Sequence, residues 1–415
     1  MLPAMAQTQN RFDYNYIILG AGFLILFFSS GTRMAFGLVL VPMTKDLDIS
    51  RSVLSSAFTV FMVVSAIAMP VVGRLIDLYS IRVIIAVSTV IGATAFALMG
   101  QITSSWHLFV LYGFVFAVGH AGSSIAPISV LMSRWFPERR GFAASVAISG
   151  NGTGQLVIIV LMTAFLESLG WRMSYAILGA VNAVVVLPLA LAVVRSYPPT
   201  TMPKKRENIT QSEASIHSTS LVEVIRSREF LLLMIMFAVC GAQDFFMATH
   251  VVAFAQDMGL SQRLSGNVLA FMGLLGLVGV LLAGVMSDKL GASKPTLLCY
   301  LIRIGLFAYI SVFQDTLSIA TFALIYGFTF TMTAPLTVVF ISNIFGTSRL
   351  GTLSGLINMI HQVFGGIGAV LGAAIFDSRG SYDMAFLIML ILSVVAVLAV
   401  VFLREKPNIV KLPHG

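Results

Sequence analysis

Long apolar runs separated by short polar segments dominate this sequence. The runs are of helical length and form two sets of six, near residues 15–41, 53–73, 81–100, 107–133, 141–167 and 172–194, then 230–256, 264–286, 295–313, 317–344, 352–375 and 382–403. A helix crosses a bilayer with about 20 mostly apolar residues. The pattern therefore predicts an all-α membrane protein with twelve transmembrane helices.

One long polar stretch, residues 195–229, separates the two sets of runs. It is rich in Ser, Thr and Pro and carries Lys204, Lys205 and Arg206. Such composition is typical of a flexible linker. We therefore predict an N-terminal bundle at 1–194, a linker at 195–229 and a C-terminal bundle at 230–415.

Composition supports the membrane assignment. The chain is 58% hydrophobic and 10% charged, whereas soluble domains carry about 25% charged residues. This excludes a soluble enzyme, a secreted disulfide scaffold and a nucleic-acid binder. Cys240 and Cys299 lie inside apolar runs, which predicts packing residues and no disulfide.

The net charge of +8 reflects topology, because most Lys and Arg residues fall on one side of the predicted spans. The positive-inside rule then places both termini and the linker in the cytoplasm, in a multi-pass protein of the cell (inner) membrane. The sequence contains no Walker A motif, no metal-ligand spacing and no catalytic triad signature. We expect no enzyme activity, no cofactor and no metal, and transport driven by a gradient or a counter-substrate.

The two halves of the chain repeat each other. GRLIDLYSIR (73–82) returns as GVMSDKLGASK (284–294), KDLDIS (45–50) as QDMGLS (256–261), and WRMSYAIL (171–178) as YDMAFLIM (382–389), each at an offset of 211. YGFVF (112–116) returns as YGFTF at an offset of 214. These offsets predict a duplicated six-helix unit.

Over essentially its whole length the chain resembles the major facilitator superfamily. The resemblance rests on a Gly-x-x-x-Asp loop signature at Gly73 to Asp77 and its copy at Gly284 to Asp288. It implies two pseudo-symmetric six-helix bundles with a substrate site near the bilayer midplane, and alternating access by rocking of the bundles. It also implies a cytoplasmic gate, to which we assign Gly73, Arg74, Asp77, Arg82, Gly284, Asp288 and Lys289.

Two further segments are similar to particular members. RWFPERRGFAASVAISGNGTG (134–154) resembles the entrance to helix five of monocarboxylate transporters, and residues 29–52 resemble helix one of the oxalate/formate antiporter group. The expected helix-eight Arg is missing, because residues 273–287 carry no charge. Lactate or oxalate specificity therefore does not follow from the resemblance.

Three charged residues lie away from the ends of predicted spans, where each costs about 2.5–3.5 kcal/mol without a partner or a function. Arg33 and Asp244 occupy equivalent places at the offset of 211 and are expected to face one another, as a transport switch or as a constitutive salt bridge. Arg303 in helix nine either replaces the missing cation as a substrate contact or is a structural Arg bound to carbonyl groups or to Asp244.

Uncharged and titratable groups extend the predicted cavity. Asp244, His250 and His361 are candidates for carrying a coupling proton, although a lone His is more often a hydrogen-bonded core residue. The other candidate substrate contacts, which can equally be helix-packing residues, are Tyr112, Asn151, Gln155, Gln243, Tyr326, Asn358 and Gln362.

The sequence thus predicts a secondary transporter for a small organic anion, preferably a monocarboxylate, with a proton or a counter-anion as its coupling partner. We expect a monomer in the lipid bilayer. An efflux carrier for amphiphilic compounds is the nearest alternative, and a solute sensor without net flux is a second. Competition by cationic drugs favours efflux, and binding without flux favours the sensor.

Overall fold

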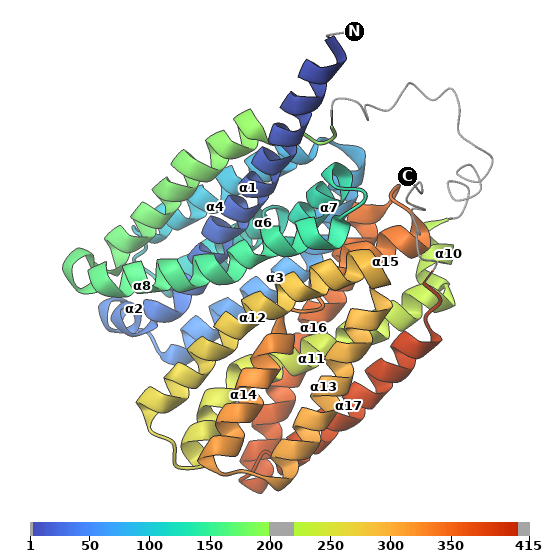
Figure 1. Cartoon of the computed structure of the whole chain (residues 1–415). Helices are drawn as coiled ribbons and strands as arrows, with labels where there is room; N and C mark the ends of the chain where they lie inside the picture. Colours follow the sequence, from blue (N-terminus) through green and yellow to red (C-terminus); the bar gives the residue numbers. More distant parts are fainter. Residues whose placement is uncertain (1–2, 199–219, 406–415) are drawn as a thin grey trace. The chain divides into compact units, whose positions relative to one another are not determined.

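The computed structural model describes residues 3–198 and 220–405, and every regular element in these ranges is helical (Figure 1). The predicted linker thus lies largely outside the described residues. The elements before it are α1 (Pro3–Leu38), α2 (Leu40–Leu47), α3 (Arg51–Leu78), α4 (Ile81–Met99), α5 (Ser105–Leu108), η1 (Phe109–Phe116), α6 (Ala117–Gly122), α7 (Ile125–Trp135), α8 (Arg140–Val181), η2 (Asn182–Val186) and η3 (Leu189–Val193). The elements after it are α10 (Leu221–Arg226), α11 (Arg228–Asp257), α12 (Gln262–Leu290), α13 (Ser293–Val312), α14 (Thr316–Phe330), α15 (Leu336–Phe345), α16 (Leu350–Arg379) and α17 (Asp383–Phe402).

Polar residues before the apolar runs start several of these helices. The hydroxyls of Ser50, Ser227 and Ser261 each accept a hydrogen bond from a backbone N–H in the first turn of α3, α11 and α12. Asp315 caps α14 in the same way, and its hydrogen bonds with Ser318 lower the pKa of its carboxyl. Such caps satisfy N–H groups that have no partner inside the helix.

Among the described residues, eleven helical segments are long and apolar enough to cross a membrane. The element α8 contains one of them and the start of the next, which continues through η2 and η3, because Gly170 adopts φ +70° and turns the chain near the junction of Arg140–Leu166 and Ser168–Val193. A positive φ suits glycine, which has no Cβ. The predicted fifth and sixth spans are thus confirmed as separate helices.

The predicted tenth span, 317–344, is interrupted. Turns over residues 331–335 separate α14 from α15, and both pieces are shorter than the other spans. Pro335 has no backbone N–H to continue a helix, and N–H groups of the turn bond three residues back, as from Ala334 to Thr331. The fourth span has a similar break at Ser123 and Ser124, between α6 and α7.

Two compact units make up the chain. The first comprises Met1–Pro137, Val146–Lys204 and Gly351–Gly355, and the second comprises Glu138–Ser145, Lys205–Leu350 and Leu356–Gly415. Each unit consists mainly of one half of the sequence. The bundle boundaries at 1–194 and 230–415 stay a prediction.

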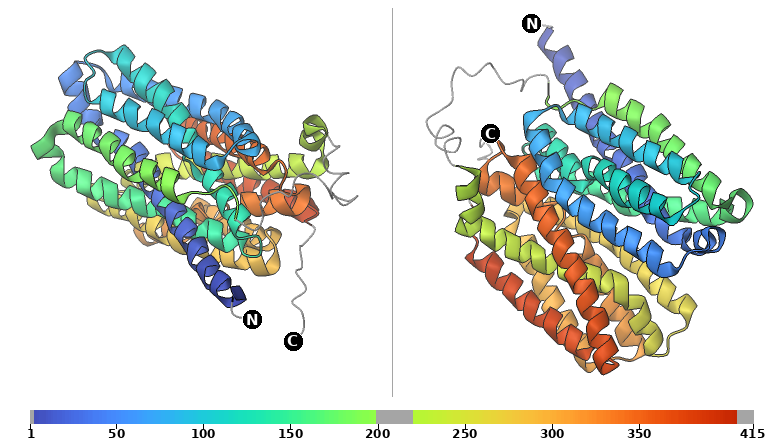
Figure 2. Two further views of the ribbon diagram at one scale, coloured as in Figure 1. Left: turned by 90° about the horizontal axis from the view of Figure 1, so that it is seen from above. Right: turned by 180° about the vertical axis from the view of Figure 1, so that it is seen from behind.

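Each unit has its own aromatic core. In the first, Phe36 stacks on Tyr112 with 4.0 Å between ring centroids, and Phe61 stacks on Tyr112 and Phe116. In the second, Phe307 and Phe386 belong to the corresponding cluster. Figure 1 shows the neighbouring helices α13 and α17 of the second unit in orange and red, and Figure 2 shows them from two other sides. Inside a bilayer such packing stabilises through close contact of side chains rather than through exclusion of water.

Candidate functional site

A buried ion pair lies at the centre of the second unit. The guanidinium Nη2 of Arg303, on α13, lies 2.8 Å from Oδ1 of Asp244, on α11. Arg303 is completely buried and Asp244 almost so. Arg303 donates further hydrogen bonds to the Gln243 side chain and to the Thr329 hydroxyl and carbonyl. Of the two alternatives for Arg303, the structure therefore contains the one in which it pairs with Asp244.

Gln243 also hydrogen-bonds to this ion pair. Its amide oxygen accepts from Arg303, and its amide nitrogen donates to the carbonyl of Met389 and the hydroxyl of Ser393 on α17. All its polar atoms thus serve the packing of α11, α13 and α17. Gln243 was predicted to contact substrate, and the structure places it in the protein interior with no exposed surface.

The second oxygen of Asp244 faces other titratable groups. Its Oδ2 accepts a hydrogen bond from the Cys240 thiol at 3.3 Å and lies 3.7 Å from Nε2 of His361 on α16. The hydroxyl of Tyr326 donates to Oδ1 at 3.1 Å. The structure thus brings together five predicted site residues, namely Gln243, Asp244, Arg303, Tyr326 and His361. Cys240 joins them because it lies one helical turn before Asp244, so it is more than an inert packing residue.

His250 has the environment of a hydrogen-bonded core residue. Its Nδ1 lies 3.2 Å from the hydroxyl of Tyr382 and its Nε2 lies 2.8 Å from the carbonyl of Ala369. Both ring nitrogens are therefore occupied within the second unit, and in the described residues neither of them bonds to Asp244 or His361. Its role in proton coupling stays a prediction.

Arg33 in the first unit has a different environment from Arg303. Its Nε is buried without a hydrogen-bond partner, and within the described part of the first unit it has no acidic partner. It lies close enough to Tyr112 and His120 for electrostatic interaction. Tyr112 is fully buried, and among the described residues its hydroxyl has no hydrogen-bond partner. Arg33 and Asp244 belong to different units, so their pairing stays a prediction.

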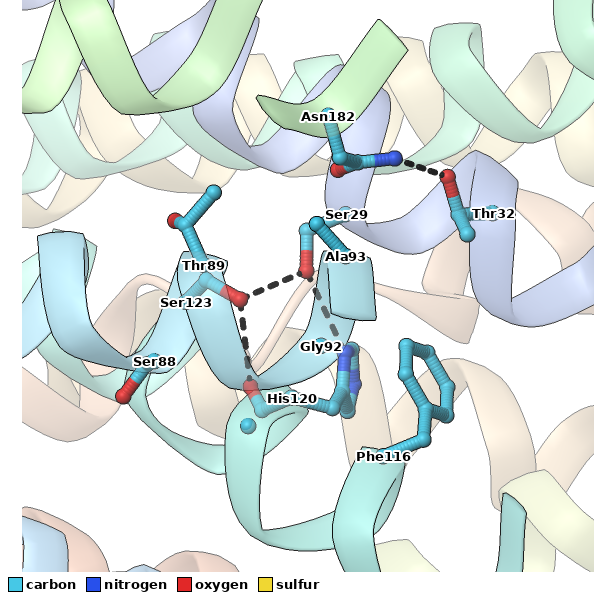
Figure 3. A pocket seen from close by; sticks show the side chains of 11 residues that line it. Ser29, Thr32, Ser88, Thr89, Gly92, Ala93, Phe116, His120, Ser123 and Asn182 are labelled. Atoms are coloured by element: carbon cyan, nitrogen blue, oxygen red, sulfur yellow. Dashed lines mark hydrogen bonds between the residues drawn. The ribbon is translucent and has the colours of Figure 1, made fainter. Parts of the chain in front are cut away.

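A small polar pocket lies beside this region of the first unit (Figure 3). The hydroxyl of Ser29 lies 3.2 Å from Nδ1 of His120 and 3.0 Å from the hydroxyl of Ser123, and the amide of Asn182 donates to the hydroxyl of Thr32 at 2.7 Å. Its lining comes from α1, α4, η1, α6 and η2, and comprises Ser29, Thr32, Ser88, Thr89, Gly92, Ala93, Phe116, Gly119, His120, Ser123 and Asn182.

Sequence reasoning missed most of this pocket. Ser29 and Thr32 are three residues apart on α1 and Ser88 and Thr89 are adjacent on α4, a weak signal because single hydroxyls are common in membrane helices.

The other predicted contacts lie on the long helices α8 and α16. Asn151 and Gln155 are half-buried on α8, Asn358 is half-buried on α16, and Gln362 is buried there.

The two carboxylates of the repeated loop signature each accept hydrogen bonds from the start of another helix, Asp77 from α16 and Asp288 from α8. Asp77 accepts hydrogen bonds from the N–H groups of Gly351 and Thr352, and the Thr352 hydroxyl donates to it as well. Asp288 accepts from the N–H groups of Gly141 and Phe142 at 2.8 Å each. A carboxylate at a helix N-terminus satisfies free N–H groups and complements the helix dipole.

The glycines of the signature allow this close approach. A Cβ at Gly73 would collide with the carbonyl of Gly351, and a Cβ at Gly284 would collide with the hydroxyl of Ser145 and the carbonyl of Gly141. In both cases the two contacting segments belong to the same compact unit.

The basic residues of the predicted gate lie on the surface. Arg74, Arg82 and Lys289 are exposed, and over the described ranges they form no ion pair with Asp77 or Asp288. The hydrogen-bond partners of the two carboxylates are instead backbone N–H groups and, for Asp77, also the Thr352 hydroxyl, and the sequence does not reveal them.

This many apolar helices, with charges buried inside them, define an integral membrane carrier rather than a soluble enzyme. The chain belongs to the Major Facilitator Superfamily, whose profile matches residues 22–369 and 282–414. It is therefore a secondary transporter. The predicted family, the all-helical fold and the absence of enzyme activity are confirmed.

Several relatives are similar over most of their length. The uncharacterized MFS-type transporter YcxA of Bacillus subtilis is 29% identical over 84% of this chain and 85% of its own. The oxalate:formate antiporter of Oxalobacter formigenes is 24% identical over 95% and 92%. Monocarboxylate transporter 12 of Mus musculus is 24% identical over 72% and 66%.

The fold is similar to that of a solved carrier. The E. coli fucose:proton symporter FucP superimposes with a TM-score of 0.72 at 17% identity, over 94% of this chain and 100% of that chain. At this identity the likeness shows the fold alone.

Proposed function

We propose that the protein carries a small organic anion, a monocarboxylate, and that Arg33 binds its carboxylate. The observation that carries this proposal is the contrast between the two intramembrane arginines. Arg303 is neutralised by Asp244 at 2.8 Å, whereas Arg33 has no acidic partner in the described part of its unit. An unneutralised guanidinium inside a membrane needs a counter-charge, and its planar fork matches a carboxylate in two parallel hydrogen bonds.

The surroundings of Arg33 suit a short substrate with one charged end. Next to it in the sequence, Thr32 lines the polar pocket with Ser29, His120 and Asn182. These groups donate and accept hydrogen bonds but carry no acidic charge, so they favour a hydroxyl or carbonyl over a cation. The names of two relatives, a monocarboxylate transporter and an oxalate:formate antiporter, support the same class.

For coupling, we propose that Asp244 and His361 bind the proton if the carrier is a symporter. His361 is the half-exposed member of the pair, with 27% of its side chain accessible, and lies 3.7 Å from Asp244. An imidazole changes its charge near neutral pH and so suits a coupling proton. Exchange against a counter-anion is the second coupling mode, and it would use Arg33 alone.

We further propose that the helix-start contacts of Asp77 and Asp288 close the cytoplasmic side, with both termini in the cytoplasm. Each contact can form and break without moving a charge into the bilayer, because the carboxylate is half-buried and near the end of its helix. Gly73 and Gly284 permit the approach. Asn151, Gln155, Asn358 and Gln362 are retained as proposed cavity residues.

The test is uptake of labelled mono- and dicarboxylates into proteoliposomes, with and without an inside-alkaline pH gradient. We compare the wild type with Arg33→Gln and Arg33→Lys, and use Arg379→Gln as a matched control because Arg379 is an exposed residue at the end of α16. We expect R33Q to abolish uptake, R33K to retain part of it, and R379Q to transport as the wild type does.

The outcomes separate the hypotheses. Uptake that needs the gradient identifies a proton-coupled acid carrier, and uptake that needs an internal anion identifies exchange. Unchanged affinity and turnover in R33Q would overturn the role of Arg33. Transport of amphiphilic drugs, with no carboxylate moved under any condition, would replace the proposal by the efflux alternative.

A further inference from the structure

We propose that Cys240, Asp244 and His361 form a binding site for a borderline-soft divalent cation of the Zn²⁺ class. The cluster joins two helices of the second unit, since Cys240 and Asp244 lie on α11 and His361 on α16. One ligand atom from each residue, namely a thiol sulfur, a carboxylate oxygen and an imidazole nitrogen, lies within 4.8 Å of the other two. No such site follows from the sequence, because His361 is far from the other two residues along the chain.

Two of the three distances between ligand atoms match a tetrahedral metal, and the third is below 4.8 Å. Bonds of about 2.0–2.3 Å to sulfur, nitrogen and oxygen place neighbouring ligand atoms roughly 3.3–3.8 Å apart. In the structure Cys240 Sγ lies 3.3 Å from Asp244 Oδ2, and His361 Nε2 lies 3.7 Å from the same oxygen. Cys240 and Asp244 are one helical turn apart, so a rigid backbone holds two of the three ligands on one face.

Arg303 binds the Asp244 carboxylate of the cluster and fixes its orientation. Its guanidinium and the Tyr326 hydroxyl both occupy Oδ1 of Asp244, which leaves Oδ2 directed at Cys240 and His361. Outer partners of this kind fix the position of a ligating carboxylate. The positive charge of Arg303 opposes a cation, but a thiolate at Cys240 and the carboxylate at Asp244 offset most of the combined charge. Three protein ligands leave a fourth position for water or an anion.

His361 is the most exposed of the three residues in the cluster. Its side chain is 27% exposed, whereas Asp244 is 9% exposed and Cys240 is fully buried. A cation that binds releases the thiol proton and takes the imidazole nitrogen that otherwise faces the Asp244 carboxylate. The site does not require an organic substrate, but it uses Asp244 and His361, to which the proposed function assigns the coupling proton, so a bound cation and that proton compete for the same atoms.

The test is direct binding of Cd²⁺, a spectroscopic substitute for Zn²⁺, to the purified full-length protein in detergent. Thiolate-to-cadmium coordination gives an ultraviolet charge-transfer band, so the readout reports a Cys ligand and not transport. We compare the wild type with Cys240→Ser and His361→Gln. The matched control is Cys299→Ser, because Cys299 is the other buried cysteine and its Sγ lies 3.7 Å from the carbonyl of Thr329, outside the cluster.

We expect wild type and C299S to bind one Cd²⁺ with the band, C240S to lose the band, and H361Q to bind at least ~10-fold more weakly. Zn²⁺ should displace the Cd²⁺, and the affinity should fall as pH falls because protons compete for the thiolate and the imidazole. Asp244 is not replaced, since its loss would leave Arg303 buried without a counter-charge.

A band that persists in C240S, or that disappears in C299S, would overturn the proposal. So would equal affinities in wild type and H361Q, because His361 would then not be a ligand. Should C240S fail to fold, the comparison of H361Q with C299S still decides, since His361 is the more exposed member. Failure here leaves the carboxylate-uptake result unaffected, because neither measurement uses the other.

Discussion

Breaking the Arg303–Asp244 pair should destabilise the protein strongly, and breaking both partners together should cost less than the sum. In Asp244→Asn the guanidinium keeps its hydrogen bonds to Thr329 and Gln243 but loses its only acidic partner within 4 Å in the described residues. In Arg303→Gln the carboxylate keeps the hydrogen bonds from Tyr326 and Cys240. Each single change leaves one buried charge without its counter-charge.

The magnitude follows from this burial. Arg303 has no exposed surface and the Asp244 side chain is 9% exposed, and removing one partner of a buried pair costs about 3–5 kcal/mol. Asn and Gln still accept or donate hydrogen bonds, so we expect values near the lower end, about 3 kcal/mol for each single variant. The double variant removes both charges and keeps polar groups, so we expect it to recover about 2 kcal/mol or more relative to the sum.

The assay is denaturant-induced unfolding in detergent micelles for the wild type, both single variants and the double variant. The control is Asp46→Asn, which breaks the ion pair of Asp46 with Arg172. That pair has 46% and 39% exposed side chains, so its loss should cost at most about 1 kcal/mol. Additive losses in the double variant would refute the reasoning, because they would show that the two charges do not stabilise each other.

Three further predictions concern other parts of the chain. Gly73→Ala should slow transport sharply while total expression is retained, because its Cβ meets the Gly351 carbonyl; transport at the wild-type rate would contradict the close approach. His250→Phe should lower the unfolding free energy by about 1–3 kcal/mol through loss of the Tyr382 and backbone partners, and an unchanged unfolding midpoint would contradict a core role. Asn182→Leu should cost about 0.5–1.5 kcal/mol, because it removes a buried hydrogen bond to the hydroxyl on α1, and the unfolding midpoint again measures it.

The helices were predictable from the sequence because the apolar runs are as long as a membrane span requires. The expected runs at 230–256 and 382–403 correspond to α11 and α17 within a few residues. The break between α14 and α15 was not predicted, since the run 317–344 is apolar throughout and its interruption depends on turns near Pro335. Apolar composition identifies a span, but it does not report local backbone geometry.

The side-chain partners were less predictable than the helices. The sequence singled out Arg303 and Asp244 as intramembrane charges but left open whether they pair, and it paired Asp244 with Arg33 through the internal repeat. The structure shows Arg303 at 2.8 Å from Asp244. Positions at the offset of 211 occupy equivalent places in the two halves, but equivalence of backbone position does not determine which side chains meet.

Cys240 shows why a single sequence hides such a site. A cysteine in an apolar run is usually a small packing residue, and nothing in the local sequence distinguishes Cys240 from Cys299. The difference is that Cys240 precedes Asp244 by one turn on a helix that packs near His361, whereas Cys299 lies near a backbone carbonyl. Only the tertiary arrangement of α11 and α16 reveals it.

The two halves of the sequence differ in their intramembrane charges, and this difference bears on the proposed function. Two identical halves would present identical chemistry to a substrate, and a monocarboxylate has one charged end and one uncharged end. In this chain the repeat places Arg at position 33 and Asp at position 244, and the second unit then neutralises its Asp with Arg303. The first unit keeps the guanidinium of Arg33 without an acidic partner among its described residues. Under the proposal that Arg33 binds a carboxylate, the first unit therefore supplies the counter-charge for the anion, whereas the charge of Arg303 in the second unit is already neutralised by Asp244.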